Sequence, residues 1–199
     1  MAKDRSFARL VSLACHDLRT PLATVHGFAR TLAGTELGDP AARYVELMES
    51  ASVQLGELLD RVSLAAQIEG ERYDPELNSA DLLAVARAAA ERVQEGEVDV
   101  VGPGGTARTA AGALELALHD LARCVIRHGG MPDVTLRVDG AAIELGRVPA
   151  EVAPILLGEN LRDFGAAVAV RTIEALGGSV SVESERLVVR LAAAGDQAA

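Results

Sequence analysis

A histidine followed directly by an aspartate stands near the start of the chain, in the stretch ACHDLRTPL at residues 14–22. The Asp17 carboxylate can take the proton from one imidazole nitrogen of His16 and leave the other nitrogen as a nucleophile. Thr20 follows one helical turn later, where its hydroxyl can position a water molecule. The plainer interpretation of the same residues is a solvated histidine with ordinary charged neighbours. For a lone histidine that plainer interpretation would be preferred, so the choice depends on the whole string of residues around His16.

An amphipathic helix over residues 5–33 must position this histidine. Its apolar residues recur at steps of three and four and predict one buried stripe, formed by Phe7, Leu10, Val11, Ala14, Leu18, Leu22, Val25, Phe28 and Leu32. His16 lies off that stripe, so its side chain is expected to face water or a partner. Pro21 lies inside the helix and lacks the amide hydrogen that would bond the carbonyl of Asp17, which predicts a bend just after the histidine.

A second amphipathic helix follows a turn at residues 34–40, with Asp39 as the expected N-cap and Pro40 at the first helical position. It extends to about residue 68, and its apolar stripe contains Tyr44, Leu47, Met48, Ala51, Leu55, Leu58, Leu59, Val62, Ala65 and Ile68. Two long helices joined by a short turn form an antiparallel hairpin, which buries only one face of each helix. Pairing two hairpins into a four-helix bundle would close the core and predicts a homodimer. Packing of the hairpin on the rest of the chain is the alternative.

The composition is that of a folded chain with a core of small aliphatic side chains. Of the 199 residues 49% are hydrophobic, only 3% are aromatic, and the formal charge is −10. This charge argues against binding nucleic acid or an anionic membrane through bulk electrostatics. Cys15 and Cys124 show neither metal-ligand spacing nor a disulfide framework, which is typical of a reducing cytosol. With no apolar run long enough to span a membrane and no signal-peptide pattern, a cytoplasmic location is expected.

The remainder of the chain alternates helices with short strands after a polar connector at residues 70–78. Helices are expected near residues 79–93, 109–128 and 160–176, with a strand at 98–101 that ends at the glycines of 102–105. Asn78 or Ser79 is the expected cap of the first of these helices. Strands on either side of Asp139-Gly140 predict a hairpin, and residues 179–191 predict a second one. The fold class is α+β: an N-terminal helical hairpin, then a mixed or antiparallel sheet with helices on one face.

The string HDLRTPL with the following Gly27-Phe28 closely resembles the phosphoacceptor box of two-component sensor histidine kinases. Residues 58–70 also look like the end of the second dimerisation helix of that family. The order of elements after residue 70, and the stretch EALGGSVSVES at 174–184, resemble the ATP-binding (Bergerat) domain of these kinases. The resemblance implies a dimerisation and phosphoacceptor hairpin at 1–70, an ATPase-like α/β sandwich at 71–194 and a frayed tail at 195–199.

The resemblance weakens where the family binds nucleotide. The family holds magnesium with paired asparagines, and Asp120 and Cys124 stand at those positions; a thiol is a poor Mg²⁺ ligand. Where the family has an adenine-reading aspartate and glycine boxes, only the single glycines Gly146 and Gly165 remain. The segment 149–160 is too short and too apolar for a flexible nucleotide lid. Together these changes predict weak or absent ATP binding, with Asp120 the metal ligand only if Mg²⁺ and ATP do bind.

An intact phosphoacceptor half with a degenerate nucleotide half resembles dimeric histidine phosphotransferases with a vestigial kinase domain. The resemblance implies that His16 exchanges phosphate with the aspartate of response-regulator receiver domains, which bring their own Mg²⁺, so no cofactor is expected on this chain. Asp17 would orient and deprotonate His16, and Arg19 would offset phosphate charge. Thr20 with Asp17 would position water for dephosphorylating a receiver. The family's geometry places receiver docking below His16, on a surface that includes Thr24, Gly27 and Arg30.

Two other functions are compatible with the same residues. An ATP-dependent sensor kinase core with divergent nucleotide boxes would keep His16 as nucleophile and would use Asp120 for its metal. A non-catalytic dimeric scaffold, or a phosphatase, for a response regulator would not need His16 to carry phosphate. Nucleotide binding separates the first alternative from the vestigial-domain interpretation, and removal of His16 separates the scaffold from both.

Overall fold

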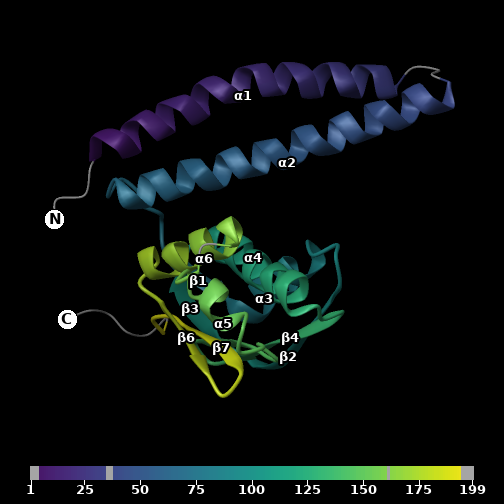
Figure 1. Ribbon diagram of the computed structural model, residues 1–199. Helices are drawn as coiled ribbons and strands as arrows, with labels where there is room; N and C mark the ends of the chain where they lie inside the picture. The colour runs from purple at the N-terminus through teal and green to yellow at the C-terminus, as the bar shows by residue number, and fades with distance from the viewer. Residues whose placement is uncertain (1–4, 35–37, 161, 194–199) are drawn as a thin grey trace. The chain divides into compact units, whose positions relative to one another are not determined.

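The computed structural model describes residues 5–34, 38–160 and 162–193; of residues 5–10, 12–14, 17, 21, 39 and 40 it describes the backbone alone. The chain divides into two compact units, Met1–Tyr73 and Asp74–Ala199, which Figure 1 shows as a pair of long helices and a mixed α/β body. The sequence places the boundary at residue 70, slightly before this division. Its expected tail, 195–199, lies outside the described residues.

The first unit is a hairpin of two helices, α1 (Arg5–Ala33) and α2 (Asp39–Glu69), which lie side by side (Figure 1). The expected helices at 5–33 and to about 68 are confirmed. Helix α1 continues through Pro21 without a break and curves along its length (Figure 1). The expected N-cap Asp39 is wrong: the cap is Gly38, whose carbonyl already accepts hydrogen bonds from the amides of Ala41 and Ala42 at 2.9 and 3.1 Å.

The apolar stripes of the hairpin are only partly covered within one chain. Small side chains at Cys15, Ala29, Val45, Ser52 and Ala66 are buried, and α1 approaches α2 closely enough that a Cβ at Gly56 would lie 3.8 Å from Leu22. Of the stripe expected on α1, Leu18, Val25, Phe28 and Leu32 are exposed in the single chain, and its burial by a second copy stays a prediction. Ten large apolar side chains of the two helices are exposed: Leu18, Val25, Phe28, Leu32, Tyr44, Leu47, Met48, Val53, Leu55 and Leu58.

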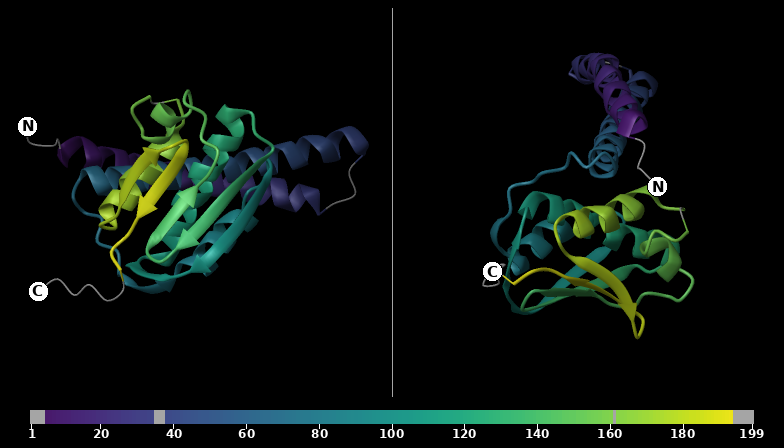
Figure 2. Two further views of the ribbon diagram at one scale, coloured as in Figure 1. Left: turned by 90° about the horizontal axis from the view of Figure 1, so that it is seen from below. Right: turned by 90° about the vertical axis from the view of Figure 1, so that its left-hand side faces the viewer.

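The second unit is a five-stranded mixed sheet covered by helices on one face (Figure 2). The strand order is β2-β4-β5-β7-β6, in which β2 and β4 are parallel and the other pairs antiparallel; β1 and β3 form a separate two-stranded sheet. The elements are β1 (Asn78–Asp81), α3 (Leu82–Glu91), β2 (Glu97–Gly104), β3 (Thr106–Thr109), α4 (Ala111–Gly129), β4 (Asp133–Asp139), β5 (Ala142–Leu145), α5 (Ala153–Leu156), α6 (Phe164–Ala175), β6 (Ser179–Glu183) and β7 (Arg186–Arg190). The α+β class and both expected hairpins are confirmed.

Strand β2 does not end at Gly102, which corrects the expected strand at 98–101. The strand continues to Gly104, with an irregularity in its pairing to β4 after Val101. Gly102 has φ +114°, and a Cβ there would lie 2.2 Å from the carbonyl oxygen of Val138. Only glycine allows this backbone and this close approach, so the glycines bend the strand against β4 instead of terminating it.

Two helix starts also differ from expectation because aspartates cap them. Residues 78–81 pair with β3, and the Asp81 side chain accepts hydrogen bonds from the amides of Leu83 and Ala84 at 2.9 and 3.3 Å. Helix α6 begins at Phe164, because the Asp163 carboxylate accepts a 3.0 Å bond from the amide of Ala166. Asn78, Ser79 and Asn160 therefore lie outside the helices they were expected to begin.

The core of the second unit lies between the sheet and helices α3, α4 and α6. The largest fully buried side chains come from both layers: Leu82, Leu114, Leu118, Leu121, Leu136, Ile143, Leu156, Ile173, Leu176, Leu187, Val125 and Val134. Helix α6 contacts α4 and buries the small residues Gly165, Ala166, Ala167 and Ala169, of which Gly165 lies against Asp120 of α4. Small side chains let two helix backbones approach closely, which places polar groups of α4 next to the start of α6.

Candidate functional site

His16 is exposed on α1, next to the buried Cys15. Thr20, one turn later, is exposed as well, so the two side chains share the solvent side of the helix as their spacing predicts. The Thr24 hydroxyl donates a 3.1 Å hydrogen bond to the Thr20 carbonyl and stays on its own helix. The side chain of Asp17 lies outside the described residues, so its role toward His16 stays a prediction.

Arg19 is held by the second helix. Its Nη2 lies 2.5 Å from Oδ1 of Asp60, and both side chains are about half or more exposed, at 48% and 65%. The pair ties α1 to α2 beside the histidine. Arg19 must leave or share Asp60 before it can offset the charge of a phosphate on His16, a condition that the sequence did not indicate.

The residues expected to receive a partner below His16 are all exposed: Thr24, Gly27 and Arg30. Arg30 lies 3.7 Å from the carboxylate of Glu49 on α2, so this surface draws on both helices. A Cβ atom added at Gly27 would meet no other atom within 4 Å, so the helix surface is open at this residue. The docking role itself stays a prediction.

The residues expected at a nucleotide site divide into two places in the second unit. Asp120 of α4 is 3% exposed, and its Oδ1 lies 3.1 Å from Nδ1 of His119. A Cβ at Gly165 would lie 3.1 Å from the Asp120 carboxyl group, so these two residues meet where α4 contacts α6. Gly146 is elsewhere: its amide donates a 3.0 Å bond to the Thr135 carbonyl and extends the pairing of β5 with β4.

Cys124, one turn after Asp120, is fully buried and faces the start of α6. Burial, and then the negative charge of Asp163, raise the pKa of its thiol to about 12. A neutral buried thiol offers Mg²⁺ none of the hard oxygen ligands that this ion prefers. Cys124, at a position where the resembled family has an asparagine, therefore cannot ligate Mg²⁺ as an asparagine oxygen would.

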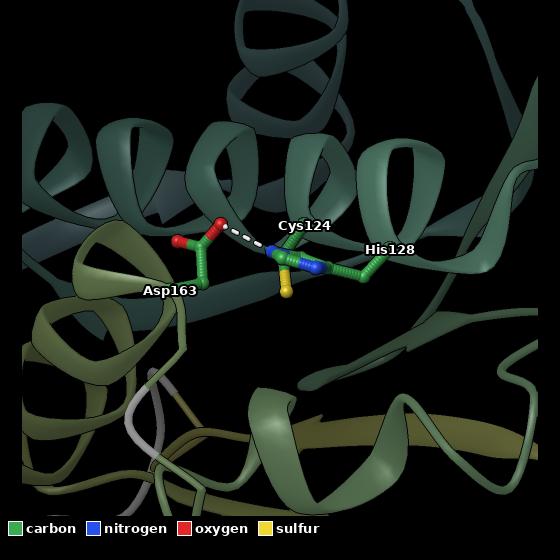
Figure 3. Close-up of side chains that lie close together, drawn as sticks. All are labelled: Cys124, His128 and Asp163. Carbon is green, nitrogen blue, oxygen red and sulfur yellow. Dashed lines mark hydrogen bonds and ion pairs between the residues drawn. The ribbon is translucent and has the colours of Figure 1, made fainter.

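Cys124 is instead part of a cluster that sequence reasoning missed. His128 Nε2 lies 3.2 Å from Oδ2 of Asp163, and ligand atoms of Cys124, His128 and Asp163 all lie within 4.8 Å of one another (Figure 3). The Cys-x3-His spacing on a helix could have indicated half of this cluster. Asp163 could not have been assigned to it, because 35 residues separate it from His128.

The segment expected to be too short for a nucleotide lid is folded against the body. It contains the helical turn α5, and Val152, Ile155 and Leu156 are buried. Helix α5 contacts both α4 and α6. Asp120 contacts His119 and position 124 carries a thiol, and the expected weak or absent binding of ATP and Mg²⁺ stays a prediction. Among the described residues, no helix is long and apolar enough to cross a membrane.

Comparisons with known proteins agree with this architecture. Residues 8–71 match the His Kinase A (phospho-acceptor) domain family. The chain is 30% identical over 95 residues to hybrid signal transduction histidine kinase L of Dictyostelium discoideum. The aligned residues make up 46% of this chain and 6% of that relative. The chain thus spans only a small part of the length of the curated relative it matches.

Two solved structures share the fold. Full-length ShkA, crystallised in complex with AMPPNP, has a TM-score of 0.68 at 23% identity, over 94% of this chain and 47% of its own. The ATP-binding domain of PrrB from Mycobacterium tuberculosis has a TM-score of 0.50 at 22% identity, over 60% of this chain and 98% of its own. At these identities the similarity is evidence for the fold alone, and in the comparison with ShkA it spans both units.

Proposed function

We propose that this chain carries phosphate on His16 and exchanges it with the aspartates of response-regulator receiver domains. Two similarities support the proposal: residues 8–71 match the His Kinase A (phospho-acceptor) family, and the fold is that of a histidine kinase core. The observation that carries the proposal is the exposed His16 within a matched phosphoacceptor helix. The second unit keeps the fold of a kinase ATP-binding domain, and its residues do not fit the nucleotide. The expected ATP-independent phosphotransfer follows from that combination.

The transfer needs an unhindered imidazole nitrogen and a group to manage its proton. The lone pair of that nitrogen attacks the phosphorus of the receiver's aspartyl phosphate in line; the N–P bond forms while the P–O bond to the carboxylate breaks. Asp17 accepts a hydrogen bond from, or the proton of, the second ring nitrogen, and so keeps the attacking nitrogen unprotonated. The receiver's Mg²⁺ offsets the charge of the moving phosphoryl group. The reverse sequence loads a second receiver.

A homodimer is part of this proposal. The exposed apolar side chains of the hairpin include Phe28 at 67%, Tyr44 at 65% and Leu47 at 59%. Many large apolar side chains exposed on two packed helices support an interaction surface there. A second copy of the hairpin would bury it in a four-helix bundle and would leave His16, on another face of α1, accessible to a receiver.

An ATP-dependent kinase is the second candidate, and one observation favours it. ShkA, which shares the fold over 94% of this chain, was crystallised with AMPPNP, a nucleotide analogue. In this alternative Asp120 would hold the metal after leaving His119, and segment 149–160 would have to open. A regulator-binding scaffold without phosphotransfer, or a phosphatase, is distinguished by the variants below.

The deciding experiment follows phosphate onto the purified chain from two donors. Incubation with a radiolabelled phosphorylated receiver is expected to label the wild-type chain, while radiolabelled ATP with Mg²⁺ leaves it unlabelled. His16→Ala abolishes the labelling, and His26→Gln, which changes another histidine of the same helix, retains it. Calorimetric titration with a nucleotide analogue and Mg²⁺ is expected to show no binding at millimolar concentration.

The other outcomes identify the alternatives. Labelling by ATP with Mg²⁺-dependent analogue binding would establish the kinase and refute the ATP-independent route. A chain that binds the receiver yet is never labelled is a scaffold. Thr20→Ala separates dephosphorylation from transfer: loss of phosphate release from the receiver, with labelling of His16 intact, would place a water-positioning role at Thr20.

A further inference from the structure

The cluster of Cys124, His128 and Asp163 has the chemistry of a transition-metal site. It combines a thiol, an imidazole and a carboxylate, three of the groups that bind Zn²⁺ in proteins. All three come from the contact between α4 and α6, with Cys124 fully buried, the Asp163 side chain 6% exposed and that of His128 25% exposed (Figure 3). It is the one group of this kind among the residues whose placement is described.

The distances suit a tetrahedral ion. Zinc bonds of about 2.0–2.1 Å to nitrogen and oxygen put two such ligands about 3.3 Å apart at the edge of a tetrahedron. Nε2 of His128 and Oδ2 of Asp163 are 3.2 Å apart. The ligand atoms of all three residues lie within 4.8 Å of one another, so the sulfur needs a shift of about 1 Å, within the reach of a side-chain rotation.

The surroundings fix the ligands and leave a ligand atom available on each. Oδ1 of Asp163 accepts the 3.0 Å bond from the Ala166 amide that caps α6, so Oδ2 alone points at the cluster. A Cβ at Gly165 would lie 3.3 Å from Oδ1 of Asp163, so glycine leaves room for the carboxylate. Cys124 and His128 are one turn apart on α4 and project to the same side.

We propose that Cys124, His128 and Asp163 bind one Zn²⁺ ion per chain, with water as the fourth ligand. The thiol releases its proton to solvent as the sulfur–zinc bond forms, and the hydrogen bond between His128 and Asp163 is replaced by two metal bonds. The thiolate and the carboxylate together neutralise the ion. Arg127, whose Nη1 lies 3.9 Å from Oδ2 of Asp163, also pairs with Glu95 at 3.4 Å and can turn to that exposed partner.

A zinc ion here would act as a structural cross-link at the place where the resembled family binds nucleotide. One zinc ion would join α4 to the start of α6, where the polar links in the chain alone are the pairs of Asp163 with His128 and Arg127. The proposal does not depend on phosphotransfer at His16: the metal residues all lie in the second unit, and phosphate exchange needs none of them.

The test is cobalt and zinc binding to the full chain prepared without metal. One equivalent of Co²⁺ is expected to give the near-ultraviolet thiolate charge-transfer band and the strong visible bands of a tetrahedral site, and one equivalent of Zn²⁺ is expected to remove both. Cys124→Ser abolishes the charge-transfer band and weakens zinc affinity by about 100-fold or more, judged by competition with a chromophoric chelator. Cys15→Ser removes the other buried thiol and is expected to leave spectrum and affinity unchanged.

Asp163→Asn keeps the fold testable, because an asparagine oxygen can still cap α6 while the ligand charge is lost. It is expected to retain the charge-transfer band, lower zinc affinity and keep the wild-type circular dichroism spectrum. Absence of the charge-transfer band in the wild-type chain overturns the proposal. So does a band that survives Cys124→Ser or disappears with Cys15→Ser. None of these outcomes bears on labelling of His16, so the two proposals fail separately.

Discussion

The hairpin and the α/β unit place their apolar and polar side chains in opposite ways. On the hairpin, large apolar side chains such as Phe28 and Tyr44 are exposed, and so is His16, the proposed phosphoacceptor. In the α/β unit Leu114, Leu118 and Leu121 of α4 are fully buried, and the polar residues Asp120 and Asp163 are buried as well. In the single chain, the hairpin therefore leaves much of its apolar surface uncovered, whereas the α/β unit buries its apolar core and also these two aspartates.

This difference agrees with the proposal that phosphotransfer at His16 is retained without ATP binding by the second unit. The proposed phosphoacceptor needs one exposed histidine on a helix, and His16 is exposed on α1, which packs along α2. A nucleotide site needs several distant groups in register and open to solvent. The α/β unit retains the scaffold for that purpose, while Asp120 is engaged by His119 and α5 covers the face that a lid would open. Each prediction below tests one side of this contrast.

The largest expected effect is on the association of the hairpin. Leu55→Asp puts a charge into the exposed stripe that a second copy would cover, and is expected to convert a dimer into monomers by sedimentation or light scattering. Val53→Asp is the matched control: Val53 is similarly exposed, at 47% against 52%, and lies about 200° around the helix from Leu55. A wild-type chain that is already monomeric, or equal behaviour of the two variants, would contradict the dimer.

The next prediction compares a buried leucine of the α/β unit with an exposed leucine of the hairpin. Leu114→Ala removes a fully buried side chain of α4 and is expected to destabilise the α/β unit by about 2–5 kcal/mol. Leu47→Ala on the hairpin, where the side chain is 59% exposed in the single chain, is expected to leave the free energy of unfolding of the α/β unit unchanged. Chemical denaturation followed by circular dichroism measures both. A negligible effect of Leu114→Ala would mean that the α/β core is not tightly packed.

A smaller effect is expected at the cap of α3. Asp81→Ala leaves the amides of Leu83 and Ala84 without their carboxylate acceptor and should cost about 1 kcal/mol of stability. Asp81→Asn keeps an oxygen acceptor and should retain most of that stability. The measurement is again the free energy of unfolding. Equal losses in the two variants would show that charge rather than capping is responsible.

The smallest effect is expected from the ion pair of Arg19 with Asp60. Because both side chains are about half or more exposed, a double-mutant cycle with alanine should give a coupling of only about 0.2–1 kcal/mol. Asp60→Ala should nevertheless change the rate of phosphate transfer to His16, since it releases Arg19 beside the reacting nitrogen. An unchanged rate, with Arg19→Ala also neutral, would remove Arg19 from the site.

Much of the fold was accessible from local pattern alone. Apolar residues recur every three or four positions over 5–33 and 40–68, and this spacing identifies both helices. The pair Asp139-Gly140 identifies a hairpin, in which Gly140 has φ +58°. The caps were less predictable. Several polar residues precede each helix, and which one bonds the free amides depends on strand pairing, as at Asp81 opposite β3.

What the sequence by itself determined is the helical hairpin, the α+β class and the position of His16 on the solvent side of its helix. These depend on residue types a few positions apart, where periodicity and turn chemistry suffice. Tertiary structure alone decided the order of the strands, the engagement of Arg19 by Asp60 and the meeting of Cys124, His128 and Asp163. Those features join segments far apart in the chain, and their placement follows from how whole elements pack, because no local pattern encodes which distant side chain fills a given space.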